Sequence, residues 1–70
     1  MKEIKLSNGQ VVKMREPKVK DMKLVKDVED DFEREIKLIV NLTEMTPEEV
    51  ENLSMKDFNK LDKALQDFLF

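Results

Sequence analysis

Few side chains of this 70-residue chain could carry out covalent chemistry. Histidine, cysteine, tyrosine and tryptophan are all absent, so no imidazole could act as general base for a serine or threonine nucleophile. The candidate hydroxyl groups also occupy positions typical of turns and helix caps, at Ser7, Thr43, Thr46 and Ser54. The sequence therefore predicts a protein that is not an enzyme and has no catalytic residue.

Carboxylates gather in one short stretch that could suggest a divalent metal site. They are Asp27, Glu29, Asp30, Asp31, Glu33 and Glu35. A calcium loop needs alternating ligands around a central glycine, and the single glycine of this chain, Gly9, lies far from the stretch. The sequence also has no glycine-rich phosphate loop. We therefore expect no metal and no cofactor, and interpret the stretch as a solvated helix start, where carboxylates are favoured.

The charges are distributed unevenly along the chain. The net charge is −3, but residues 1–26 carry eight basic and three acidic side chains, whereas residues 27–57 carry three basic and eleven acidic ones. The basic stretch 13–26 contains no aromatic side chain that could stack on bases, and we expect no nucleic-acid partner. The asymmetry could guide a protein partner or head-to-tail contacts between copies, although two solvated helix faces of opposite sign are the simpler interpretation.

The length predicts a single domain over residues 1–70, with a hairpin over 1–16 and a helical part over 17–70. A chain this short buries a thin core, so self-association would be a plausible source of extra stability. No apolar run approaches the roughly 20 residues of a membrane span, and the first residues do not form an apolar signal region. We expect a soluble cytoplasmic protein with no membrane partner.

The first strands are expected at about residues 2–6 and 10–15, on either side of Ser7-Asn8-Gly9. A two-residue turn at Asn8-Gly9 would place Val12 on the face opposite Ile4. A three-residue loop with a left-handed Gly9 would instead pair Ile4 with Val12 and collect four apolar side chains on one face. We favour this second register because the first moves apolar groups into water; the four are Ile4, Leu6, Val12 and Met14.

Three to four helices are expected after Pro17, at about residues 18–28, 31–42, 47–53 and 55–69. Residues 18–42 could form one helix or two. The first segment should turn Val19, Met22, Val25 and Val28 inward and its lysines outward. Thr46-Pro47-Glu48-Glu49 is a capping box, and Ser54 offers a second cap with Asp57 as its reciprocal residue. The chain should thus adopt an α+β fold that is mostly α, with the hairpin packed on a small helical bundle.

Two apolar patterns mark the core and could also bind a partner. The segment 36–42 is apolar around most of a helix, and the last helix has a narrow apolar seam that leads into Phe68-Leu69-Phe70. The terminal apolar residues suggest a patch for self-association or for another chain. The candidate partner-binding residues are Ile36, Ile39, Val40, Phe58, Leu61, Leu65, Phe68, Leu69 and Phe70, and each has a structural role as an equal alternative.

The order of these motifs resembles the Mu-like family of phage tail assembly chaperones over nearly the whole chain. The matching segments are Leu6-Ser7-Asn8-Gly9, Val11-Val12, Arg15-Glu16-Pro17-Lys18-Val19-Lys20-Asp21-Met22, Asn41-Leu42-Thr43, Met45-Thr46-Pro47-Glu48-Glu49-Val50, Leu53-Ser54-Met55-Lys56-Asp57-Phe58, Leu61 and Phe68-Leu69.

This resemblance implies a non-enzymatic protein that binds the tape-measure protein and keeps it soluble before the tail tube polymerises. It also implies recruitment of tail tube subunits, action in the host cytoplasm and absence from the mature virion. The residues alone leave two alternatives, a small oligomeric scaffold or adaptor and, with less support, a nucleic-acid-binding regulator.

Overall fold

The N-terminal hairpin forms in the three-residue register. In the computed structural model, which describes residues 1–70, β1 (Lys2–Lys5) pairs antiparallel with β2 (Val11–Met14), and Ile4 lies opposite Val12. Gly9 has a φ of +88°, and its N–H donates to the Leu6 carbonyl at 3.0 Å. The predicted apolar face is confirmed, because Leu6, Val12 and Met14 are buried and Ile4 packs against them.

Gly9→Val should destabilise the protein by about 1–2 kcal/mol, because a side chain in the left-handed region is strained. A Cβ at this position would meet no heavy atom within 4 Å, so the expected cost lies in the backbone and not in a clash. Urea denaturation would measure the change, with Gly9→Asn as the matched control, since asparagine tolerates this conformation better. Equal midpoints for Gly9→Val and wild type would contradict the left-handed loop.

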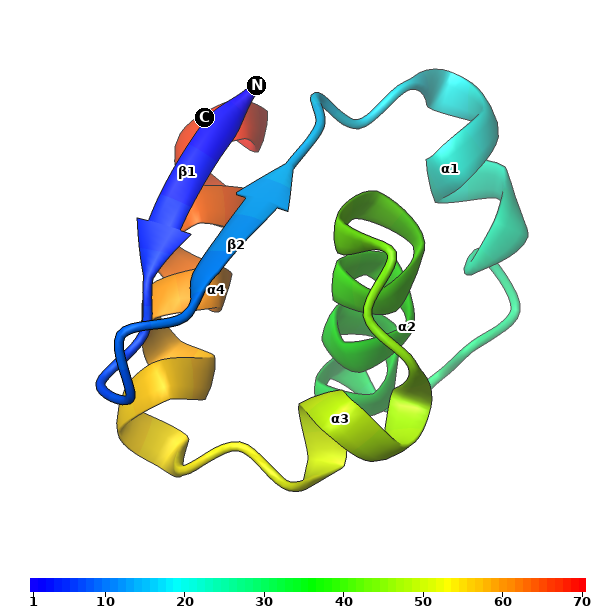
Figure 1. Cartoon of the computed structure of the whole chain (residues 1–70). Coiled ribbons are helices and arrows are strands. Elements are labelled where there is room, and N and C mark those ends of the chain that lie inside the picture. Colours follow the sequence, from blue (N-terminus) through cyan, green and yellow to red (C-terminus); the bar gives the residue numbers. More distant parts are fainter.

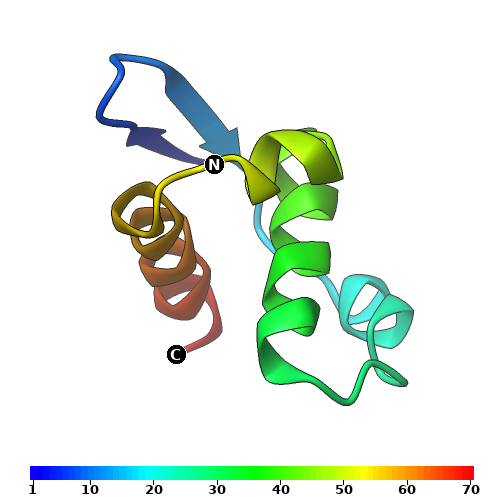
Figure 2. The same cartoon turned by 90° about the horizontal axis from the view of Figure 1, so that it is seen from below.

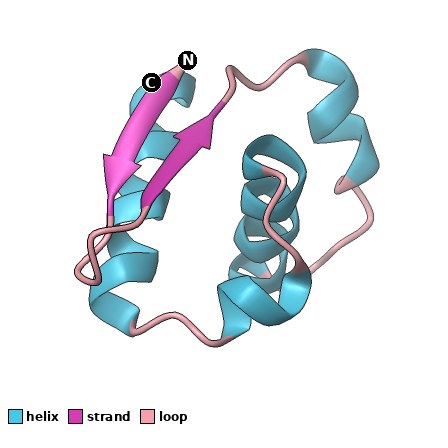
Figure 3. Ribbon diagram, viewed as in Figure 1, coloured by secondary structure: helices cyan, strands magenta, loops and turns pink.

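Four helices follow the hairpin: α1 (Val19–Leu24), α2 (Asp31–Thr43), α3 (Pro47–Glu51) and α4 (Met55–Leu69). The α+β, mostly α, fold is confirmed, and residues 18–42 form two helices (Figure 3). Asp30 begins α2 by accepting a hydrogen bond from the Glu33 N–H at 3.0 Å.

The two predicted caps differ in how well they form. The Thr46 capping box is complete, with the Glu49 N–H donating to Thr46 Oγ1 and the Thr46 N–H donating to Glu49 Oε1. Ser54 Oγ caps α4 by accepting a hydrogen bond from the Asp57 N–H, but the Asp57 side chain does not accept one from the Ser54 N–H in return. Its carboxylate instead accepts hydrogen bonds from the N–H and Oγ of Ser7, at 3.0 and 2.8 Å, and so ties α4 to the hairpin loop.

The hairpin lies over α2 and α4, and these three elements enclose the core (Figure 1). α1 lies on the side of α2 that faces away from α4, as the second view shows (Figure 2). β1 and the end of α4 are linked by an ion pair, in which the Lys2 ammonium lies 3.5 Å from the Asp67 carboxylate. None of the helices combines the length and the apolar character needed to cross a membrane. The buried apolar residues are Leu6, Val12, Met14, Val25, Leu38, Ile39, Leu42, Met45, Val50, Phe58, Leu61, Ala64 and Leu65.

The prediction for the first helix was wrong in its length and for two of the four residues expected to point inward; of the other two, Val25 is buried and Val28 packs against the core. α1 ends at Leu24, four residues before the expected end at position 28, and Val19 is 79% exposed. Met22 is also exposed, whereas Asp21 is only 1% exposed. The Asp21 carboxylate accepts two hydrogen bonds from the Arg15 guanidinium, at 2.8 and 2.9 Å, and others from the Lys18 N–H and the Asn41 side-chain amide, both at 2.7 Å. This polar cluster, rather than the valine pattern, sets how α1 is rotated.

Candidate functional site

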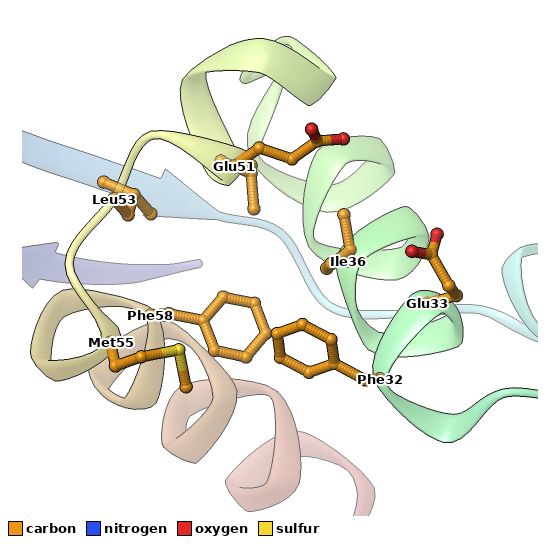
Figure 4. A pocket seen from close by; sticks show the side chains of 8 residues that line it. Phe32, Glu33, Ile36, Glu51, Leu53, Met55 and Phe58 are labelled. Atoms are coloured by element: carbon orange, nitrogen blue, oxygen red, sulfur yellow. The ribbon is translucent and has the colours of Figure 1, made fainter.

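An open apolar pocket of about 340 Å³ lies between α2, α3 and α4. It is at the small end of the range for ligand pockets, roughly 300–1,000 Å³. Six of its eight lining residues are apolar, and two glutamates complete it. In Figure 4 the hairpin lies behind the pocket, and the two carboxylates point away from its apolar floor. The lining residues are Phe32, Glu33, Ile36, Val50, Glu51, Leu53, Met55 and Phe58.

Two aromatic rings bridge α2 and α4 at this pocket. Phe32 and Phe58 meet edge to face, with ring centroids 5.1 Å apart and an angle of 62° between the planes. Phe58 belongs to the core, but Phe32 is about half exposed and Met55 is 57% exposed. The floor of the pocket is therefore fixed by core packing, while its walls leave apolar surface in water. Contiguous exposed apolar surface of this kind is typical of interaction sites.

A second hollow of about 220 Å³ extends the pocket along α2. It shares Glu33, Ile36 and Glu51 with the first and continues to Val40 and Pro47, with Lys37 also in its lining. We call the two hollows together the α2–α3 groove. Phe32, Ile36 and Val40 recur every fourth residue and so line one face of α2 over about 12 Å.

The candidate partner-binding residues fall into three environments. Ile36, Val40 and Phe58 line the groove. Ile39, Leu61 and Leu65 are core residues with almost no exposed surface. Phe68 and Leu69 are half-buried near the end of α4, and Phe70 is 98% exposed.

Eight groove residues were not among those candidates. The spacing of Phe32 from Ile36, one helical turn, was a usable signal in the sequence. The other seven lie on α2 or α3, or where α3 gives way to α4, and no local pattern marks them as neighbours; they are Glu33, Lys37, Pro47, Val50, Glu51, Leu53 and Met55.

Another hollow, of about 390 Å³, lies between α1, α2 and the end of α4, and Glu35 lines it together with Arg34 and Phe70. A hydrogen bond with the Asp62 carboxyl, burial, and the negative charges of Asp62 and Asp31 raise the pKa of Glu35 to about 7. The two carboxyls face each other from α2 and α4. Deprotonating both therefore weakens the packing of these helices.

Glu35→Gln should remove a pH dependence of stability. Because the folded-state pKa of Glu35 is raised, its contribution is fully present below the unfolded-state pKa of about 4.3 and is lost as pH rises through about 7. Wild type should therefore lose thermal stability between pH 5 and 8, whereas Glu35→Gln should lose much less over the same interval. Thermal melts across this range would measure it, with the exposed Glu48→Gln as control. Parallel curves for wild type and Glu35→Gln would contradict the carboxyl pair.

The α2–α3 groove can act by binding. Its side chains offer apolar walls, two aromatic rings and two carboxylates at the rim. Such a surface gains free energy when apolar side chains of another molecule are buried in it.

The comparisons with known proteins identify one family. The sequence model described as phage tail assembly chaperone proteins, E, or 41 or 14, matches residues 7–69. No curated protein and no solved structure matches the chain. The matched residues run from the hairpin loop to the end of α4, and so include every residue of the groove.

Proposed function

The chain belongs to the family of phage tail assembly chaperones, and from that premise we propose that it binds the tape-measure protein and keeps it soluble while the tail tube is assembled. The motifs in the sequence predicted this family, and the family match confirms that prediction. A role in tail assembly also implies protein partners within the host cell. The identity of the client is the proposed part.

The observation that carries this proposal is the exposed apolar wall of the α2–α3 groove. A tape-measure protein is expected to be a long amphipathic helix whose apolar stripe is exposed until the tube surrounds it. A groove that presents Phe32, Ile36 and Val40 in a row suits the recognition of a helix through apolar residues spaced by one turn. Binding there would cover the client stripe and prevent aggregation.

The same proposal includes a second surface at the end of α4. Phe70 is 98% exposed beside Leu69, and the Lys2 ammonium lies 4.9 Å from the centre of the neighbouring Phe68 ring. This surface could recruit a tail tube subunit or a second copy of the chain. We further propose that the protein acts in the host cytoplasm and leaves before the virion is complete. If this terminal surface alone were functional, the protein would be an oligomeric scaffold without a client.

Co-expression with the tape-measure protein of the same phage, followed by pull-down, tests the proposal. We expect a client that is insoluble alone to be recovered in a soluble complex. A well-expressed client that remains insoluble, with none retained by the chaperone, would overturn the proposal. In that case the solution mass of the chain would show whether it is a scaffold.

A further inference from the structure

We propose that the α2–α3 groove selects a helix whose apolar anchors are flanked by lysine or arginine. This inference rests on the proposed function, because it specifies the chemistry of the client segment. It is carried by the charges around the groove and by the geometry of its apolar row.

The two carboxylates at the groove lie on opposite sides of it. Glu33 lies on α2 and Glu51 on α3, and both line the two hollows (Figure 4). Neither forms an ion pair within the chain; the carboxylates that do are Asp21, Asp31, Asp57 and Asp67. Two unpaired carboxylates beside apolar walls form a binding site for a cation attached to an apolar segment.

The basic side chains of the protein are concentrated elsewhere. Eight of the 13 lie in residues 1–26, which form the hairpin and α1, whereas α2, α3 and their flanks belong to the acidic stretch 27–57. Lys37 is the one cation in the groove lining, and it lies only in the second hollow. The half of the groove around Phe32, Met55 and Phe58 is therefore negative. Complementary charge across an interface contributes mainly to selectivity and association rate.

The size of the groove limits the length of helix that it can hold. The row from Phe32 to Val40 spans about 12 Å, which corresponds to about two turns of a partner helix. Two anchors one turn apart would occupy the two hollows. A lysine or arginine beside them could lay its aliphatic stem on Phe32 or Met55 while its charged end reaches a carboxylate.

A second copy of the chain is the other candidate occupant of the groove, because its own α1 belongs to the basic part of the sequence. That helix has only six residues, and its most exposed apolar side chains, Val19 and Leu24, are five positions apart. Residues five apart lie about 140° apart around a helix and do not form one anchor row. The groove geometry therefore favours a longer helix of another protein.

Two helix-forming peptides of about 20 residues would test the proposal, since shorter helices are only marginally stable in water. They share one apolar stripe and differ only in carrying lysine or glutamate beside it. Fluorescence anisotropy of the labelled peptides gives their Kd values. We expect the lysine peptide to bind about tenfold more tightly, through two partly exposed ion pairs, and the difference to shrink as salt is raised. Equal affinities at low salt would overturn the proposal.

Charge-reversed variants locate the effect. Glu33→Lys combined with Glu51→Lys should abolish or invert the peptide preference. The matched control combines Glu3→Lys with Glu16→Lys, two exposed positions outside the groove lining; each pair changes the net charge from −3 to +1. An equal loss of preference in the control would assign the effect to overall charge and overturn the proposal. Thermal melts check folding, and if the reversed variant is unfolded, Glu33→Gln with Glu51→Gln replaces it.

Two further results separate this inference from the proposed function. If the tape-measure protein is retained while the peptides show no preference, the charge rule fails and the chaperone proposal stands. If the lysine peptide is preferred but the tape-measure protein is not retained, the rule stands and the client is a different protein. If light scattering shows that the Glu33/Glu51 reversal alone dissociates an oligomer, a second copy occupies the groove and the inference is wrong.

Discussion

Asp21→Ala is expected to lower the melting temperature by roughly 10 °C or more. The Asp21 side chain is 1% exposed and accepts hydrogen bonds from Arg15, Lys18 and Asn41. Removing the carboxylate leaves the partly buried Arg15 guanidinium without its acceptor and frees α1 from α2. Loss of one member of a buried polar cluster costs more than the cluster itself contributes, because the remaining partners are desolvated and unsatisfied. Differential scanning calorimetry would measure the shift.

Asp31→Ala provides the control for this prediction. Asp31 also pairs with an arginine, at 2.7 Å from Arg34, but its side chain is 85% exposed. Exposed ion pairs contribute little to stability, so this variant should melt within a few degrees of wild type. Similar shifts for the two variants would mean that the Asp21 cluster has no special structural role.

The Asp21 effect should also depend on pH in a defined direction. The hydrogen bonds from Arg15, above all, and from the Lys18 backbone hold the pKa of the Asp21 carboxyl well below its usual range. A lowered folded-state pKa means that the stabilisation is present above the unfolded-state value of about 3.9 and is lost as pH falls. The melting temperatures of wild type and Asp21→Ala should therefore converge in strong acid. A gap that is constant from pH 7 to pH 2 would contradict this electrostatic account.

Ile39→Ala is expected to reduce the free energy of unfolding by about 2–5 kcal/mol. Ile39 is fully buried on α2, where the core of the bundle is centred. Removing three carbon atoms there leaves a cavity in the core, and a domain of this size has only a small stability margin. Urea denaturation followed by circular dichroism would measure the loss.

Ile36→Ala is the matched comparison for Ile39→Ala. Ile36 lies on the same helix, but it is only half-buried and lines the groove. It should lose less stability than Ile39→Ala and more client affinity relative to that loss. If the two variants were equally stable, the division of α2 into a core face and a groove face would be wrong.

The features that were predictable from the sequence depend on neighbouring residues. The Gly9 loop, the Thr46 capping box and the Ser54 cap are formed by contacts across at most four positions, and the residue types at those positions specify them. The alternation of apolar residues in the hairpin likewise fixed its register, because only one register places all four apolar side chains on the face that packs against the core.

The features that were not predictable depend on residues far apart in the chain. Asp21 meets Asn41 across 20 positions, and Asp57 meets Ser7 across 50. Apolar periodicity predicted that Val19 and Met22 point inward and missed the burial of Asp21, since it cannot indicate that a carboxylate has found enough donors to be buried. The chain reversal after α2 is similar, because Glu44 adopts a φ of 65° at a position where glycine or asparagine is the usual signal.

The candidate site, like the fold, was only partly predictable from the sequence. Helical spacing identified Ile36, Val40 and Phe58 as candidate binding residues. The same spacing also applies to Ile39, Leu61 and Leu65, which belong to the core. A pattern of apolar residues identifies the side chains that avoid water, and only the packing of the helices separates those covered within the chain from those left for a partner.

Site-specific photo-crosslinking in cells that co-express the tape-measure protein tests the central claim most directly. A photoreactive amino acid would be placed at Met55, which is 57% exposed in the groove, or at Val19, which is 79% exposed on α1 and outside the groove lining. We predict a crosslink to the tape-measure protein from position 55 and none from position 19. A crosslink to the tape-measure protein from position 19 alone, or a crosslink from position 55 only to a second copy of the chain, would contradict the account.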